Sequence, residues 1–314
     1  MDYDQEEVAM QATELKGICP IIATPFTEKG AVDYDSFANL VRTLIQGGCH
    51  AVTLFGIAGE YYKLTDEEMI RLARLTVDIC RQYGGTSILS VTQHATPVAV
   101  ARAKLYEEMG ADALMLLPPF FLKPGQAALY QHMKAVGQAV QIPVMAQYAP
   151  EQTGVAIPPA VYAQLFAECP NIAYYKIECK PAGAYITSLL GLTQRRAGVF
   201  VGNAGYQFIE GFDRGAIGAM PGCSMFDLYL RLYDAYVSGD RAGAAHIHST
   251  LILPMLNHIR QNVEMIIAFE KKILKKRGII QSDFCREPGF VSDAYYDRLF
   301  EEHYDAIRAH FSAR

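Results

Sequence analysis

Long apolar runs, surplus basic charge and closely spaced cysteines are all missing from this chain of 314 residues. No apolar run is long enough to span a bilayer, so a membrane protein is not expected. The chain has 28 basic against 33 acidic residues and a net charge of −5. A nucleic-acid partner is not expected, because a phosphate backbone requires a basic surface. The acidic, polar N-terminus lacks the basic start and apolar run of a signal peptide, so we expect a soluble cytoplasmic protein.

The seven cysteines are odd in number and widely spaced, and no CxxC pair occurs. A disulfide scaffold or a zinc site is therefore not expected, and the cysteines are interpreted as small apolar side chains in a reducing compartment. The glycine pattern GxGxxG is missing after the first predicted strand, which argues against a dinucleotide-binding sheet. We expect neither a metal ion nor a cofactor.

Short apolar runs alternate with longer amphipathic ones. The runs are nearly continuous in apolar residues, as expected for strands of a parallel sheet that is covered on both faces. The predicted strands are Gly17–Thr24, Ala51–Phe55, Thr86–Val91, Ala113–Leu117, Val144–Gln147, Ile172–Lys176, Val199–Gly202 and Ala216–Ala219.

Helices are predicted between these strands, with Asp33 as a cap for the first and a capping-box pattern at Thr65–Glu68 for the second. The predicted helices are Tyr34–Gln46, Thr65–Arg81, Pro97–Met109, Gln126–Val140, Pro158–Glu168, Ala182–Gln194 and Tyr206–Arg214. The repeated strand–helix alternation favours an α/β fold of the (β/α)₈ TIM-barrel type, although periodicity alone also allows an open, doubly wound sheet.

From about Met225 onward no strand pattern occurs. Helices are predicted instead at Met225–Ser238, Arg241–Ile259, Val263–Arg277 and Ser292–Phe311. We therefore expect an N-terminal tail at 1–16, the barrel at 17–224 and a helical extension packed on the barrel at 225–314.

Reactive residues of such barrels come from the carboxyl ends of the strands. The polar or glycine-rich candidates there are Thr24, Gly56–Glu60, His94, Gln147, Tyr148, Lys176, Glu178, Gly202 and Asn203. Lys176 follows the apolar run Ile172–Tyr175, where a lysine is costly to place. A partly desolvated lysine has a lowered pKa, and its neutral amine can attack a ketone to form an imine. The alternative is a strand-end lysine that reaches out to solvent.

The turn from Gly56 to Glu60 places two glycines around Ile57 and Ala58. Converging backbone amides in such a turn can bind a carboxylate. Glu60 is interpreted as structural, through hydrogen bonds to the amides of its own turn. The lysines at 271, 272, 275 and 276 share one predicted helix and are interpreted as solvated. Lys180, beside Pro181, is interpreted as an exposed loop residue and a poor nucleophile.

Several motifs occur in a fixed order between residues 17 and 280. They are Ala23-Thr24-Pro25-Phe26, Gly56–Glu60, Gly110–Ala113, Pro118–Phe121, Pro150–Gly154 and Lys176. In this order they resemble the dihydrodipicolinate synthase / N-acetylneuraminate lyase superfamily. The resemblance implies a barrel, a Schiff base between Lys176 and a pyruvate-type 2-keto acid, no metal, and a homo-tetramer or dimer.

The sequence departs from the superfamily's proton relay at several positions. Ile57 and Ala58 replace two hydroxyl residues, Gln147 aligns with a relay tyrosine, Phe120-Phe121 replaces aromatic hydroxyls, and Gln152 replaces a carboxylate-binding arginine. Segments 147–150, 176–178 and 257–258, together with His94, resemble instead the 2-keto-3-deoxy sugar-acid dehydratases, particularly the 2-keto-3-deoxyarabonate type.

We therefore expect a dehydratase or aldolase acting on a 2-keto-3-deoxy sugar acid. The expected catalytic residues are Lys176, Tyr148, Gln147, Glu178 and His94, and the expected substrate-binding residues are Thr24, Gly56, Ile57, Ala58, Phe121, Gly202 and Asn203. Gln147 has no titratable proton, so it could only orient a group or a water. The alternatives are a synthase-like or neuraminate lyase-like aldol reaction, or a non-catalytic keto-acid binder. The aromatic segment Tyr229–Tyr236 fits either an interface or ordinary core packing.

Overall fold

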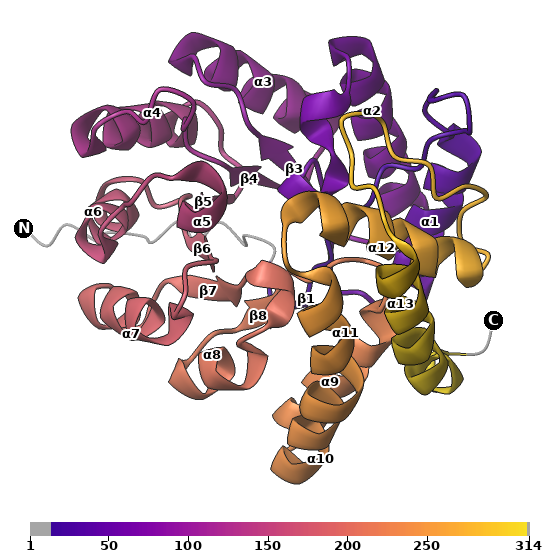
Figure 1. Ribbon diagram of the computed structural model, residues 1–314. Coiled ribbons are helices and arrows are strands. Elements are labelled where there is room, and N and C mark those ends of the chain that lie inside the picture. Colours follow the sequence, from indigo (N-terminus) through magenta and orange to yellow (C-terminus); the bar gives the residue numbers. More distant parts are fainter. Residues whose placement is uncertain (1–13, 313–314) are drawn as a thin grey trace, which may run out of the picture.

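Eight parallel strands form the centre of the molecule (Figure 1). The computed structural model describes residues 14–312, so most of the predicted tail lies outside the described residues. The strands are β1 (Gly17–Ile18), β2 (Val52–Leu54), β3 (Ser87–Val91), β4 (Ala113–Leu116), β5 (Val144–Tyr148), β6 (Tyr174–Ile177), β7 (Gly198–Val201) and β8 (Gly218–Ala219). Their order is β1-β8-β7-β6-β5-β4-β3-β2. Single bridges from Ile21 to Thr53 and to Gly222 join the first strand's continuation to β2 and to the chain after β8, so the sheet closes into the predicted barrel.

Helices surround the strands (Figure 1). They are α1 (Tyr34–Gln46), α2 (Asp66–Tyr83), α3 (Thr96–Met109), α4 (Gln126–Gln138), α5 (Pro150–Thr153), α6 (Pro159–Glu168), α7 (Ala182–Leu192), α8 (Phe208–Arg214), α9 (Phe226–Val237), α10 (Arg241–His246), α11 (Leu253–Ile259), α12 (Val263–Lys276) and α13 (Ala294–Ile307). The predicted caps are confirmed. The Asp33 side chain accepts from the Ser36 amide, and Thr65 and Glu68 form a capping box at α2.

Two apolar layers fill the barrel region. Inside the strands, Met115, Met145, Tyr174, Phe200 and Met220 pack against one another. A larger layer lies between the strands and the helices and continues into the C-terminal helices. Because successive side chains of a strand point to opposite faces, residues two apart on one strand share a layer.

The first strand is shorter than the predicted Gly17–Thr24. The regular strand ends at Ile18, because Pro20 has no amide hydrogen for the ladder. Beyond it, the amides of Cys19, Ile21 and Ile22 still donate to the chain around β8 and β2. The eighth strand is likewise reduced to Gly218–Ala219. The first turn after β5 forms α5, which the sequence pattern did not indicate.

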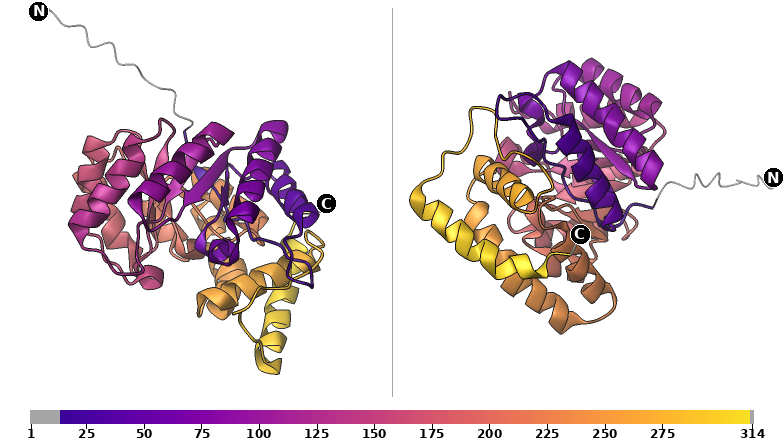
Figure 2. Two further views of the ribbon diagram at one scale, coloured as in Figure 1. Left: turned by 90° about the horizontal axis from the view of Figure 1, so that it is seen from above. Right: turned by 90° about the vertical axis from the view of Figure 1, so that its right-hand side faces the viewer.

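The C-terminal helices gather on one side of the barrel, and α13 runs along its outside (Figures 1 and 2). The predicted helix Arg241–Ile259 is continuous, but it contains a π-helical turn at Ile247–Ile252 (η4). The turn precedes Pro254, which has no amide hydrogen to donate to the carbonyl four residues earlier. The segment Tyr229–Tyr236 packs inward, with Tyr229 and Leu232 buried in the core. No helix among the described residues is long and apolar enough to cross a membrane.

Candidate active site

Strands β5 and β6 bring three predicted site residues together. Lys176 lies opposite Gln147 in the parallel register, and Glu178 follows just beyond the end of β6. Tyr174, Lys176 and Glu178 are two residues apart, so all three belong to the inner face, where Tyr174 packs in the barrel interior. The Lys176 side chain therefore lies on the inner face of β6, at the carboxyl end of the strands and next to the apolar interior of the barrel.

These three side chains form one buried polar group. Lys176 Nζ lies 3.0 Å from Glu178 Oε1, and the two side chains are 4% and 9% exposed. Gln147 Nε2 donates to the same carboxylate oxygen. A single hydrogen-bond length thus separates the amine from a group that can take or return its proton.

The other oxygen of Glu178 is held by the loop after β7. The Asn203 amide donates to Glu178 Oε2 over 3.1 Å. Gly202 is required beside it, because a Cβ there would lie 2.1 Å from Glu178 Cγ. Asn203 and Ala204, in the 3₁₀ turn η3 (Asn203–Gly205), both have left-handed φ values, of 52° and 55°. The loop backbone is thus bent away from ordinary geometry where it approaches the carboxylate.

Arg260, which the sequence pattern did not single out, supports this loop from the end of α11. Its Nε donates to Asn203 Oδ1 over 3.1 Å, and its guanidinium stacks 4.3 Å from the Tyr206 ring centre. Burial lowers the pKa of Arg260 below its ordinary value. Arg260 supports Glu178 through Asn203 and also by the electrostatic attraction between the two charges, and no spacing in the sequence connects these two segments.

The turn after β2 supplies the opposite wall. Residues Ile57–Gly59 form the 3₁₀ turn η1, in which the amides of Gly59 and Glu60 donate to the carbonyls of Gly56 and Ile57. The amides of Ile57 and Ala58 start the turn and are not used by it, as at any helical N-terminus. These two residues line the same pocket as Lys176. The predicted anion-binding turn is therefore beside the lysine.

The pocket is small, with a volume of about 60 Å³, enough for a few water-sized groups. Its walls come from the barrel loops and from α12. Lining residues are Ile21, Ile57, Ala58, Gln147, Gln152, Lys176, Glu178, Asn203, Ala204, Met220, Pro221, Gly222, Val263 and Ile266. The contribution of Val263 and Ile266 from the C-terminal extension was not predicted.

Besides Gly202, which lies behind Glu178, five predicted residues do not line this pocket. Thr24 is buried and donates to the Gly59 carbonyl over 2.7 Å, so it supports the turn. Tyr148 alternates with Gln147 and points outward, where its ring stacks 4.4 Å from Tyr185. Gly56 carries no side chain to the pocket but lies against Ile21, whose Cγ2 a Cβ would meet at 2.6 Å.

His94 and Phe121 lie on the outer surface of the loops after β3 and β4. His94 is exposed, accepts from the Phe120 amide at 3.4 Å and packs against the ring of Phe120. Phe121 is 79% exposed. Within one chain, neither side chain reaches Lys176.

Two lysine interpretations have different outcomes. Lys180 is 45% exposed and pairs with Glu151, as expected for a loop lysine. The solvated interpretation of Lys271 was wrong. Its side chain is fully buried and forms an ion pair with Glu60. Glu60 is also fully buried, and it pairs with lysines rather than with amides of its own turn.

All seven cysteines are free thiols. Burial raises the pKa of Cys19 to about 12, which makes that thiol unreactive. Among the described residues, no group of three or more His, Cys, Asp or Glu side chains is arranged to hold a metal ion.

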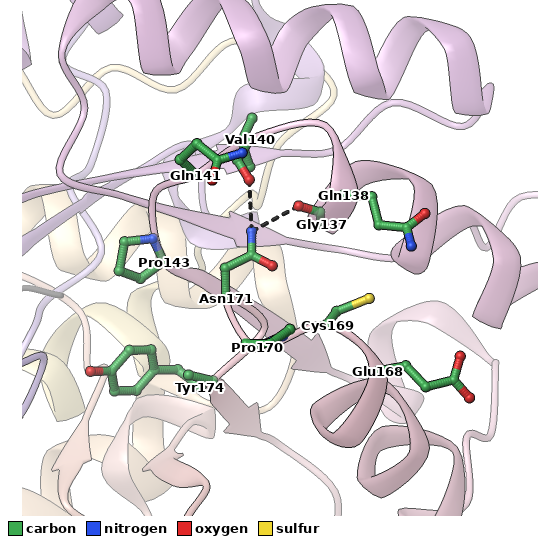
Figure 3. Close-up of a pocket in the computed structure, with 11 residues that line it drawn as sticks. Gly137, Gln138, Val140, Gln141, Pro143, Glu168, Cys169, Pro170, Asn171 and Tyr174 are labelled. Carbon is green, nitrogen blue, oxygen red and sulfur yellow. Dashed lines mark hydrogen bonds between the residues drawn. The ribbon is translucent and has the colours of Figure 1, made fainter. Parts of the chain in front are cut away.

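A larger hollow of about 490 Å³ lies at the amino ends of β5 and β6 (Figure 3). Asn171 spans part of it, because its Nδ2 donates to the carbonyls of Gly137 and Val140. Chemistry in barrels of this kind takes place at the carboxyl ends of the strands. The smaller pocket around Lys176 is therefore the candidate active site.

Comparisons with family models, with curated proteins and with solved structures agree on one family. The model of the dihydrodipicolinate synthetase family matches residues 14–303. The 4-hydroxy-tetrahydrodipicolinate synthase of Campylobacter jejuni is 36% identical over 156 residues, which are 50% of this chain and 52% of that protein. The match thus spans about half the length of that relative. The L-2-keto-3-deoxyarabonate dehydratase of Azospirillum brasilense is 27% identical over 278 residues, 87% of this chain and 88% of that protein.

Solved structures agree on the fold. Dihydrodipicolinate synthase from Rhodopseudomonas palustris superposes with a TM-score of 0.86 at 25% identity, over 93% of this chain and 97% of that one. The enzyme of the same name from Aquifex aeolicus gives a TM-score of 0.83 at 26% identity, over 94% and 97%.

Proposed function

The chain belongs to the dihydrodipicolinate synthetase family, and from that membership we propose that it is a lyase that forms a Schiff base between Lys176 and a 2-keto acid. One observation carries the proposal. The buried amine of Lys176 lies 3.0 Å from the Glu178 carboxylate, in a pocket that also contains the amide turn at Ile57 and Ala58. A nucleophile, a proton carrier and an anion site thus share one small space.

The first step is binding and imine formation. The substrate carboxylate binds the amides of Ile57 and Ala58, which places the keto carbon near Lys176 Nζ. The amine adds to this carbon after passing a proton to Glu178. The keto oxygen takes up this proton and then a second one, which Glu178 removes from the attached nitrogen, and it leaves as water. A protonated C=N bond replaces the C=O bond, and Glu178 is again a carboxylate.

The second step uses the protonated imine as an electron sink. The proton on the neighbouring carbon, C3, becomes acidic, and Glu178 is the carboxylate in the pocket that can remove it. Glu178 then carries the C3 proton and passes it to the C4 hydroxyl, which the enamine expels as water; this is a dehydratase reaction. In an aldolase reaction, Glu178 instead takes the proton of the C4 hydroxyl, the bond between C3 and C4 breaks to leave an aldehyde at C4, and the bonding electrons pass to the imine to form an enamine that is reprotonated at C3. In both cases hydrolysis of the imine releases the product and frees Lys176.

We propose dehydration of a 2-keto-3-deoxy sugar acid as the physiological reaction. The relative named L-2-keto-3-deoxyarabonate dehydratase aligns over 87% of this chain. Three carboxamide side chains, of Gln147, Gln152 and Asn203, line the pocket. Carboxamides can both donate to and accept from sugar hydroxyls. A second substrate carboxylate has no cationic partner at position 152, which disfavours the synthase reaction.

A panel of 2-keto-3-deoxy sugar acids, assayed both for water loss and for release of pyruvate, tests the reaction. We expect water loss from at least one five-carbon member, and loss of turnover with substrate binding retained in Lys176→Ala. Release of pyruvate without dehydration would contradict the dehydratase assignment. A Lys176→Ala variant that behaves like the parent in every assay would favour a keto-acid binding protein.

The remaining proposals concern assembly and location. We propose self-association as a homo-tetramer or dimer, supported by the exposed apolar side chains of Phe121 and Leu122 beside the barrel mouth. A cytoplasmic location is supported by seven cysteines that remain free thiols. We also propose that the chain is organised as a barrel at 17–224 and an extension at 225–314.

A further inference from the structure

A fully buried ion pair connects the substrate-binding turn with the C-terminal extension. Glu60, at the end of the turn, and Lys271, on α12, both have side chains with 0% exposure, and Lys271 Nζ contacts Glu60 Oε2. Lys271 Nζ also donates to the Phe284 carbonyl over 3.2 Å and lies 4.3 Å from the Phe26 ring centre. The three neighbouring lysines of α12 are between 25% and 45% exposed, so Lys271 is the exception on this helix.

Such a pair adds little to stability compared with apolar side chains of the same volume. Its directional contacts can, however, fix how two elements are placed relative to each other. The two buried charges at this contact are therefore better explained by the positioning of the turn relative to α12 than by a gain in stability.

A second contact ties the turn to the other end of the same helix. Lys63 Nζ lies 3.2 Å from Glu60 Oε1 and 3.1 Å from Glu264 Oε2. Glu264 also accepts from the Tyr62 hydroxyl. Because Glu264 and Lys271 are about two helical turns apart, α12 holds segment 60–63 at two points.

The anchored residue also closes the turn that faces the pocket. Glu60 has a left-handed φ of 60°, and its amide donates to the Ile57 carbonyl. A shift of Glu60 would therefore rotate the turn that begins with the amides of Ile57 and Ala58. Helix α12 contributes to the same pocket directly, through Val263 and Ile266.

We propose that Lys271 is a positioning residue of the active site, which acts through Glu60 to aim the amides of Ile57 and Ala58 at the substrate carboxylate. The inference rests on the proposed function, because it assigns the turn to a keto-acid carboxylate. In this proposal the C-terminal extension contributes to substrate binding through the position of the turn. Lys271 itself does not contact the substrate.

Loss of the anchor should weaken carboxylate binding more than it slows chemistry. Hydrogen bonds to a charged group contribute about 1.5–3 kcal/mol each, so misaiming the turn should raise the half-saturating concentration of a keto acid by about 10- to 100-fold. The rate at saturation should change by less than about threefold, because Lys176 and Glu178 lie on β6 and its following loop, and the contacts of Lys271 are with Glu60, Phe284 and Phe26 instead.

The test is borohydride trapping of the full-length protein across a range of pyruvate concentrations, in the parent and three variants. Lys271→Met keeps the volume and leaves Glu60 paired with Lys63. Glu264→Gln alters the outer, 36% exposed contact and carries little folding risk. Lys275→Met is the matched control, since Lys275 lies on the same helix in a surface pair with Asp283.

We expect a large rise in half-saturation for Lys271→Met, a smaller rise of about threefold for Glu264→Gln, and none for Lys275→Met. A folded Lys271→Met with the parent's half-saturation and only a lower Tm would show a merely structural pair and overturn the inference. If Lys271→Met does not fold, an unchanged half-saturation in Glu264→Gln overturns it instead. Absence of labelling in the parent would contradict the proposed function itself.

Discussion

At the scale of single residues, the alternation of side chains along β5 decides which polar groups meet Lys176. Gln147 and Tyr148 are neighbours in sequence and were both expected in the site. Only Gln147 lines the pocket with Lys176, while Tyr148 packs among Tyr162 and Tyr185 on the outer face. Burial also raises the pKa of the Tyr148 hydroxyl. Glu178 is therefore the proton carrier that the geometry favours.

Replacement of this carboxylate gives the first prediction. Glu178→Gln keeps the shape of the side chain but removes the group that accepts the lysine's proton. The rate of imine formation with pyruvate should fall by about 10²- to 10⁴-fold, measured by rapid-quench borohydride trapping. Tyr148→Phe is the control and should stay within about twofold of the parent. A reversal of this order would place the relay on the outer face of β5 and contradict the assignment.

The second prediction concerns stability at acid pH. His132 is buried against Thr96, and burial lowers the pKa of its ring to about 4. In the unfolded chain its pKa is about 6.5, so between these values only the unfolded state binds the proton. This contribution is fully present above pH 6.5 and falls as the pH decreases toward 4. By pH 5 the free energy of unfolding should lose about 2 kcal/mol from this residue.

Urea unfolding of His132→Gln at pH 7.5 and pH 5 measures this effect, because glutamine does not titrate. The difference between the two pH values should shrink by about 2 kcal/mol relative to the parent. Thr96→Val is the control, since it removes the ring's hydrogen-bond partner but leaves the titrating group. An unchanged pH dependence in His132→Gln would mean that His132 is not responsible for it.

At the scale of elements, the loop after β7 contains a glycine, Gly202, whose missing side chain leaves space for Glu178. Gly202→Ala should displace Glu178, because the new Cβ would meet its Cγ. Turnover should fall by at least about tenfold, as expected when a general acid–base group is misplaced.

Gly191→Ala provides the comparison, since nothing lies within 4 Å of a Cβ at this position of α7. It should leave turnover unchanged and stabilise the protein by about 0.5–1 kcal/mol, as alanine favours a helix over glycine. Steady-state kinetics and thermal unfolding of both variants check this pair. Equal activity of Gly202→Ala and the parent would show that the loop can move without displacing the carboxylate.

The elements themselves were largely predictable from local chemistry. Apolar runs located the strands, and Asp33 and Thr65 located two helix starts. Two deviations have local causes as well: Pro20 follows the shortened strand β1, and Pro254 follows the π-helical turn inside the helix Arg241–Ile259. The four-residue helix α5 was not indicated, because it is too short for an apolar period to appear.

At the scale of the whole molecule, the barrel and the C-terminal extension share one continuous apolar layer. We therefore expect a single unfolding transition in urea, with far-UV and near-UV circular dichroism changing together. Two separated transitions would instead show that the extension at 225–314 unfolds as an independent unit.

The long-range contacts explain why the site was only partly predictable. Lys176 and Glu178 could be found because these reactive side chains and the strand that carries them lie in one short segment of sequence. The support from Arg260 and Lys271 could not, because these residues pair with Asn203 and Glu60 across 57 and 211 positions of sequence. Lys271 shares its helix with three partly exposed lysines, so the lysine cluster led to the wrong interpretation that Lys271 is solvated.

The proposed reaction depends on a covalent bond between Lys176 and the keto acid. Peptide mass mapping after borohydride reduction in the presence of pyruvate locates this bond. We expect a single reduced pyruvyl adduct on the peptide that contains Lys176, and its loss in Lys176→Ala. An adduct on Lys180, or no adduct on any lysine, would show that Lys176 does not form the Schiff base.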